Sequence, residues 1–150
     1  MLASQLRERL VGAWRLVSYE IRPCDGSPSA YPLGRDVRGW ILYTPDGYMS
    51  AQLMAAGRPR YTNGDLQGGT DDECAAAARG YIAYSGPFQV ADDGTLTHAM
   101  DVSLFPNWIG DVQQRAVMLD GDRLQLGTVA PVRIDGREVD AVLQWARAGR

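Results

Sequence analysis

The sequence lacks several residues and motifs on which common enzyme chemistries depend. All 15 basic residues are arginine, and the absence of lysine excludes a Schiff-base mechanism and a P-loop lysine. A single histidine, His98, argues against a zinc or iron site. No GxGxxG, GxSxG or HExxH pattern is present, which removes the usual nucleotide-binding, hydrolase and metalloprotease motifs. We therefore expect no metal and no cofactor.

Basic charge, cysteine and long apolar runs are also scarce. A net charge of −3 and a pI of about 5.0 give no basis for nucleic-acid binding. Cys24 and Cys74 form no CxxC pattern, so two reduced, buried thiols are expected, with a single disulfide as the alternative. The N-terminal residues lack the apolar core of a signal peptide, and no run is long enough to span a membrane. These features predict a cytoplasmic protein with neither a nucleic-acid nor a membrane partner.

Asp-Gly pairs divide the chain at five places: 25–26, 46–47, 93–94, 120–121 and 135–136. Asp-Gly between alternating apolar runs is a strong hairpin signal, because both residues tolerate positive φ. The strands expected around these pairs are Gly12–Ile21, Gly39–Tyr43, Tyr48–Met54, Pro87–Val90, Thr95–Leu104, Val112–Leu119, Arg123–Gly127 and Val139–Arg147, with a short piece at Pro131–Ile134. The chain thus predicts one all-β domain, 1–150, in which eight or nine antiparallel strands close as a barrel.

Two helices are expected beside the strands. Ser4 to Leu10 suits a short N-terminal helix, and Thr70 to Glu73 forms a capping box that starts a longer one. Small apolar residues then recur at helical spacing as far as Tyr81, and Ser85-Gly86-Pro87 ends the helix. We expect this helix to pack on the barrel wall or to plug one end. The irregular stretches 23–37 and 55–69 are candidate lids.

Several stretches together resemble the bacterial and fungal lipocalin-like domain proteins. They are LVGAWRLVSYE (10–20), GWILYTPDGYMSAQL (39–53), ARGYIAYSGPF (78–88), THAMDVSLFPNWIG (97–110) and LDGDRLQL (119–126). The resemblance implies a calycin-type barrel with a central lumen, but no single activity, and some relatives occur beside natural-product pathways. It also implies that Arg147 on the last strand packs across Trp14 on the first.

Strand alternation assigns candidate residues to the lumen. If Trp14 on the first strand faces inward, regular alternation places Ser18 and Glu20 on the inward face as well. Glu20 would then be a carboxylate in a partly apolar cavity, where it must be paired or have a raised pKa. The alternative is a glutamate at the rim, either in solvent or paired with an arginine. The opposite face, with Tyr19 and Ile21, is apolar too, so the inward face of this strand stays open.

The strand Thr95–Leu104 has one apolar face, which takes His98 into the interior together with Met100 and Val102. His98 is either a hydrogen-bonded core residue or a proton donor and acceptor. On the strand Val112–Leu119, Arg115 faces either solvent or the lumen. In the lumen it would pair with Glu20 or with an acidic group of a ligand.

Aromatic and sulfur-containing side chains are expected around the mouth of the lumen. Trp108 lies in a hairpin loop, where it forms a pocket rim or plugs the barrel. Tyr43, Met49 and Tyr84 are candidate ligand contacts, with plain packing as the alternative.

The sequence supports functions of different classes. In the first, the lumen binds a small hydrophobic or amphipathic molecule. In the second, the protein is a cofactor-free cyclase or isomerase acting on a polyketide-like intermediate, in which Glu20 and His98 exchange protons and Arg115 stabilises negative charge. A third alternative is a solidly packed barrel that serves an interaction. A homodimer is compatible with each.

Overall fold

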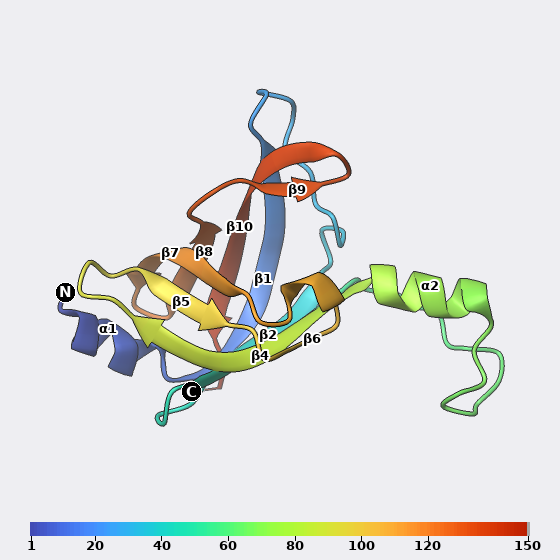
Figure 1. Cartoon of the computed structure of the whole chain (residues 1–150), viewed down its shortest axis with the longest axis horizontal. Helices are drawn as coiled ribbons and strands as arrows, with labels where there is room; N and C mark the ends of the chain where they lie inside the picture. The colour runs from blue at the N-terminus through green and yellow to red at the C-terminus, as the bar shows by residue number, and fades with distance from the viewer. Residues whose placement is uncertain (150) are drawn as a thin grey trace.

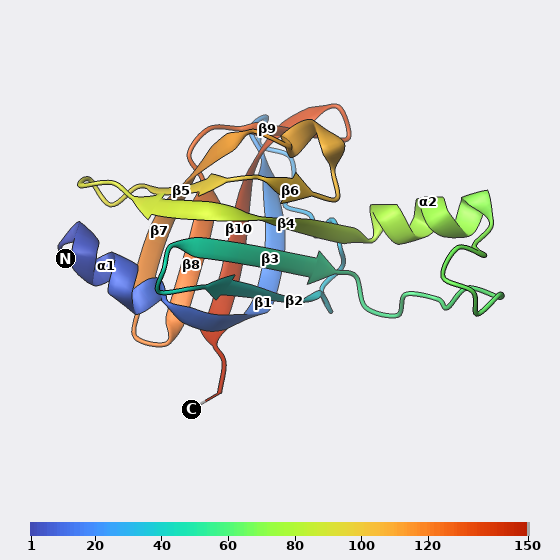
Figure 2. The same cartoon turned by 60° about the horizontal axis from the view of Figure 1, so that its bottom comes forward.

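A computed structural model describes residues 1–149, which form a closed antiparallel barrel of eight strands (Figures 1 and 2). The strands follow one another around the barrel, and the last pairs back with the first. Their bounds are β1 (Gly12–Pro23), β2 (Arg38–Tyr43), β3 (Tyr48–Met54), β4 (Tyr81–Val90), β5 (Leu96–Ala99), β7 (Val112–Asp120), β8 (Arg123–Thr128) and β10 (Arg137–Arg147). Two short strands lie beside this path: β6 (Val102–Ser103) pairs with β4, and β9 (Val132–Ile134) pairs with β10. The lipocalin-like all-β barrel expected from the sequence is confirmed.

Four of the Asp-Gly pairs form the hairpin turns of this barrel. They connect β2 to β3, β4 to β5, β7 to β8 and β9 to β10. The glycine of each pair has a positive φ, between 57° at Gly121 and 100° at Gly47. Glycine adopts this backbone region without a steric penalty, so the turns fix the order of the strands. The pair 25–26 lies instead in the long connection after β1.

Arg147 and Trp14 join the two ends of the chain at the closed end of the barrel. They are register partners on β10 and β1, and the Arg147 guanidinium lies 4.1 Å from the centre of the Trp14 ring. The guanidinium also donates to the backbone oxygens of Val11 (3.2 Å) and Arg9. The Trp14 indole donates to the Leu10 carbonyl, at 2.9 Å. Helix α1 (Ala3–Leu10), whose last residue is Leu10, is thereby fixed against the barrel.

A bulge in β1 changes which residues of that strand face inward. The register with β10 shifts between Leu16 and Ser18, so the residue between them is extra. Leu16 is buried before the bulge, and Tyr19 and Ile21 are buried after it. The predicted inward placement of Ser18 and Glu20 is therefore wrong, because a single extra residue reverses the alternation of the strand.

A second interruption reverses the alternation after β5. The pairing with β4 shifts by one residue between Phe88↔His98 and Ser85↔Val102. A Cβ on Gly86 would lie 1.8 Å from the Ala99 carbonyl oxygen, so the two backbones approach closely where the strand breaks. Val102 is 61% exposed as a result, and its predicted inward placement is wrong.

Helix α2 (Asp71–Arg79) differs from its prediction in length and position. Its capping box is present, with the Thr70 hydroxyl accepting from the Glu73 amide at 3.2 Å. The helix ends at Gly80, because Tyr81 already pairs with Met54 as the first residue of β4. None of its residues is buried, and it projects away from the barrel rather than packing on the wall (Figures 1 and 2).

The structure also bears on the cysteines and on membrane insertion. Cys24 and Cys74 are free thiols, as expected, but both are exposed rather than buried. No helix within residues 1–149 is long and apolar enough to cross a membrane.

We predict that Arg147→Ala lowers the free energy of unfolding by about 2–4 kcal/mol, because it removes a cation–π contact and hydrogen bonds from a charged donor. Urea unfolding measures this loss. Arg123→Ala, at an exposed position of β8, is the control and is expected to change stability by less than about 0.5 kcal/mol. Equal effects of the two substitutions would show that the Arg147 contact does not hold the barrel closed.

Candidate functional site

The barrel interior divides into an apolar part and a polar part. Large apolar side chains, including Trp14, Trp145 and Leu124, are fully buried at the closed end. Farther along the lumen, inward polar side chains from five strands come together. These are Tyr19 (β1), Tyr43 (β2), Tyr84 (β4), His98 (β5) and Arg115 (β7), here called the polar cluster.

His98 is the fully buried centre of the polar cluster. Its Nε2 forms a hydrogen bond of 2.9 Å with the Tyr43 hydroxyl, and its Nδ1 has no partner within residues 1–149. Burial, together with the nearby charge of Arg115, lowers the pKa of His98 from 6.5 to about 3. The imidazole is therefore neutral at neutral pH, where it acts as a hydrogen-bonding group rather than a cation.

The structure resolves the face on which Arg115 lies. Arg115 and Gln113 are half-buried on the inner side of β7, whereas Gln114 is exposed on the outer side. The guanidinium donates to the Gln113 side-chain oxygen at 2.7 Å and to the Gln114 carbonyl at 3.0 Å. Arg115 is not paired with Glu20, which lies on the outside of the barrel.

Tyr19 and Tyr43 of the polar cluster are neutral phenols. Burial raises the pKa of Tyr19 to about 12, and the neighbouring Tyr84 adds to this effect. Burial likewise raises the pKa of Tyr43 well above 10. Arg115 opposes both shifts, so its positive charge acts on each of these hydroxyls.

Aromatic rings continue from the polar cluster towards the surface. The Tyr84 ring lies 5.9 Å from His98 and packs edge-on against Trp108 at 5.7 Å, measured between ring centres. Trp108 ends the short helix η1 (Pro106–Trp108) and packs against Phe105 at 5.5 Å. Phe105 is exposed, so these rings form a path from the interior to the rim of the barrel.

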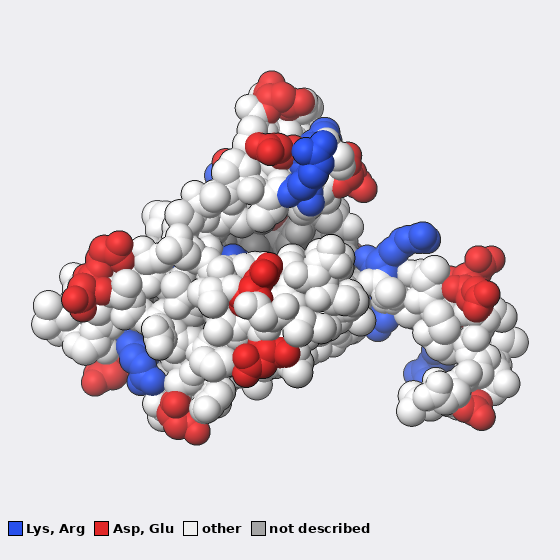
Figure 3. Space-filling model, in the orientation of Figure 1, with Lys and Arg blue, Asp and Glu red and all other residues white. Residues whose placement is uncertain are grey.

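One residue of the polar cluster, Arg115, lines a hollow that opens to solvent. This hollow of about 370 Å³ lies where β7 begins and β8 ends, and it is lined by residues 112–115 and 128–132. In Figure 3 the surface is hollowed between the projection that carries β9 and the side of the barrel formed by β5 and β6. A small molecule can approach the lumen from this side.

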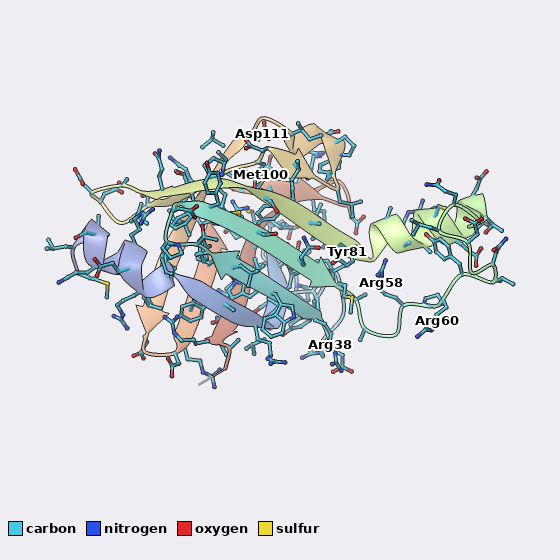
Figure 4. All side chains as sticks on the ribbon, turned by 90° about the horizontal axis from the view of Figure 1, so that it is seen from below. Arg38, Arg58, Arg60, Tyr81, Met100 and Asp111 are labelled. Carbon is cyan, nitrogen blue, oxygen red and sulfur yellow. The ribbon has the colours of Figure 1, made fainter. Side chains whose placement is uncertain are left out.

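Two further hollows lie away from the polar cluster. One of about 450 Å³ follows the outer face of β1 to β4, where Arg15 stacks on Trp40 at 4.6 Å. The other, of about 840 Å³, lies between α2 and residues 58–66. Figure 4 shows Arg58 near Tyr81, the first residue of β4, where the segment that carries α2 meets the barrel. The guanidinium carbon of Arg58 lies 5.0 Å from the centre of the Tyr81 ring. None of the three hollows is lined by His98, Tyr19, Tyr43 or Tyr84.

The sequence-derived candidates fall into two groups. Tyr43, Met49, Tyr84, His98, Met100 and Arg115 face the interior, and Trp108 is half-buried at its edge. Ser18, Glu20 and Val102 lie on the outer side. The Arg22 guanidinium, 3.3 Å away, and Ser29 lower the pKa of Glu20, so the alternative of a rim carboxylate paired with an arginine is the correct one.

Tyr19 is the residue of the polar cluster that the sequence reasoning left off its candidate list. A signal for it exists in the order of apolar residues along β1. The buried residues Trp14 and Leu16 occupy even positions, whereas the buried residues Tyr19 and Ile21 occupy odd positions. Such a change of phase within one strand indicates a bulge.

Comparisons with known proteins agree with this architecture. The family model described as a lipocalin-like domain matches residues 11–148. A 4'-hydroxy-3'-methoxypropiophenone carrier protein of Aspergillus oryzae is 41% identical to the chain over 109 residues, which cover 68% of this chain and 98% of that protein. No solved structure matches.

The lowered pKa of His98 predicts a loss of stability in mild acid. The unfolded chain binds a proton near pH 6.5, whereas the folded protein binds it only near pH 3. The stabilisation is therefore complete above pH 6.5 and falls as pH decreases towards 3, by at most about 1.4 kcal/mol per pH unit. Urea unfolding at pH 7, 6 and 5 measures the slope.

His98→Gln is the control for this slope, because His98 is the only histidine of the chain. The variant should lose most of the pH dependence between pH 7 and 5, whatever its absolute stability. The same slope in both proteins would contradict a neutral, buried His98.

Proposed function

Because the chain belongs to the lipocalin-like domain family, we propose that it binds a small amphipathic aromatic molecule in the lumen of its barrel. The polar cluster is the observation that carries this proposal. A mainly apolar interior with a few convergent polar groups is the usual form of a small-molecule site. Here the Nδ1 atom of the buried His98 has no partner within residues 1–149, and a buried polar atom gains stability from a ligand that supplies one.

The carrier protein of Aspergillus oryzae suggests the chemical class of the ligand. Its name specifies a methoxylated phenol that carries a ketone. Such a molecule offers a flat ring to the aromatic path of Tyr84 and Trp108, and oxygens to His98 and Arg115. We propose phenolic aryl ketones as the ligand class of this chain.

Binding has better support than the cyclase or isomerase hypothesis. That hypothesis requires Glu20 and His98 to exchange protons, but Glu20 lies outside the barrel wall and His98 lies inside it. A pKa of about 3 also leaves His98 poorly suited to accept a proton near neutral pH. For the compartment we propose the cytoplasm, because exposed thiols such as Cys24 and Cys74 persist under reducing conditions.

Two side chains of β7 provide a matched test of the lumen. Gln113 faces inward beside Arg115, whereas Met118 faces outward, is 65% exposed and does not line the hollow at Arg115. We predict that Gln113→Trp weakens binding of 4'-hydroxy-3'-methoxypropiophenone at least about 10-fold, because the larger side chain occupies ligand space. Met118→Trp should bind as the wild type does. Isothermal titration calorimetry measures both affinities.

Two results would overturn the proposal. One is the absence of heat and of a bound species in native mass spectrometry when the wild type is mixed with this ketone. The other is equal affinity of the two tryptophan variants, which would place the ligand outside the lumen.

A further inference from the structure

We propose that the lumen binds its ligand as an anion, with Arg115 as the counter-ion of an acidic oxygen on the ligand. This inference rests on the proposed function and narrows it to ligands that carry a carboxylate, an ionised phenol or an ionised enol. Its basis is an inward-facing arginine in a barrel whose strands, within residues 1–149, turn no carboxylate into the interior.

Arg115 has hydrogen-bonding capacity left over. A guanidinium carries five N–H donors. Two of them are used, on the Gln113 side chain and the Gln114 carbonyl, and both acceptors are uncharged. No ion pair involving Arg115 occurs within residues 1–149. Three donors therefore remain for a ligand, and a planar guanidinium can bind two oxygens at once.

The acidic residues near the lumen do not neutralise this charge. The Asp and Glu residues of the barrel strands occupy outward or exposed positions, as the pairings of Glu20, Asp120, Glu138 and Asp140 show. Asp111, just before β7, is also exposed, and in Figure 4 it lies at the edge of the molecule. A half-buried cation without an internal partner favours an anionic ligand.

Tyr19 from β1, Tyr43 from β2 and His98 from β5 face Arg115 and are uncharged near neutral pH. From β4, Tyr84 lies beside His98 in the same cluster. On the other side, Arg115 pairs with Thr128 of β8, which is also uncharged. The field of Arg115 is thus not cancelled within the lumen. Burial raises the pKa of Tyr19 and Tyr43 and lowers that of His98; the charge of Arg115 opposes the first two shifts and adds to the third. The same charge would lower the pKa of a ligand acid.

Phenolic aryl ketones fit this requirement chemically. A carbonyl group para to a phenol withdraws electrons from the phenolate and lowers the pKa of the phenol towards neutrality. The phenolate oxygen would bind the free donors of Arg115. The hydroxyls of Tyr19 and Tyr84, which make no hydrogen bond within residues 1–149, are free to donate to the same oxygen or to the ketone.

The test compares two probes that differ by one O-methyl group, which replaces the ionisable proton of the phenol. 4'-Hydroxy-3'-methoxypropiophenone ionises, whereas its methyl ether, 3',4'-dimethoxypropiophenone, does not. Titration calorimetry with each probe at pH 6, 7, 8 and 9 gives the affinities. We expect the phenol to bind more tightly as pH rises through its pKa, and the ether to bind weakly at every pH.

Arg115 variants assign the effect to one side chain. Arg115→Gln should weaken binding of the phenol at pH 9 about 10- to 100-fold, as expected for a lost charged hydrogen bond, and should remove the pH dependence. Arg115→Lys keeps the positive charge and should retain part of the pH dependence of binding. Arg123→Gln, at an exposed position on β8, should bind as the wild type does. Urea unfolding confirms that each variant is folded.

The possible failures are distinguishable. If phenol and ether bind with equal, pH-independent affinity, the lumen is a binding site but the anion inference is wrong. The inference is also wrong if Arg115→Gln keeps the pH dependence of the wild type. If neither probe binds, the proposed ligand class itself fails, and the anion inference falls with it.

Discussion

Closure of the barrel by β1 and β10 is the constraint on which the rest of the structure depends. Arg147 covers Trp14 at this seam and holds the end of α1 through backbone carbonyls. One end of the barrel is then filled by large apolar side chains, including Trp145. The polar cluster is enclosed by the same wall, with Tyr43 on β2 paired to Gly12 at the start of β1. The seam therefore closes the wall around the polar cluster.

Two irregular points on the strands determine the chemistry of the lumen. The bulge between Leu16 and Ser18 turns Tyr19 inward and Glu20 outward. The close approach of Gly86 to Ala99 turns Val102 outward. Without the first bulge, strand alternation would turn Glu20 inward. The polar cluster instead combines Arg115 with three tyrosines and a neutral histidine, which suits the proposed recognition of an acidic ligand better than proton transfer.

The sequence predicted the architecture better than the site. The Asp-Gly pairs located four hairpins, and the strand Tyr48–Met54 has the predicted bounds, because both signals are local. The prediction failed where pairing between strands overrides local pattern. Tyr81 fits a helical stripe, yet it pairs with Met54 on β3. Alternation assigned His98 correctly on an unbroken stretch of β5 but misplaced Glu20 and Val102 beyond the two interruptions, which a strictly alternating pattern cannot represent.

If a ligand occupies the lumen beside His98, as we propose, the ring of this histidine reports on it directly. As the only imidazole of the chain, it gives unambiguous side-chain ¹⁵N resonances. Titration with 4'-hydroxy-3'-methoxypropiophenone should shift these resonances and produce nuclear Overhauser effects between the probe and the rings of His98 and Tyr84. The opposite result would be resonance shifts only for residues of the hollow on the outer face of β1 to β4, around Trp40, with the His98 resonances unchanged at saturation. It would contradict binding in the lumen.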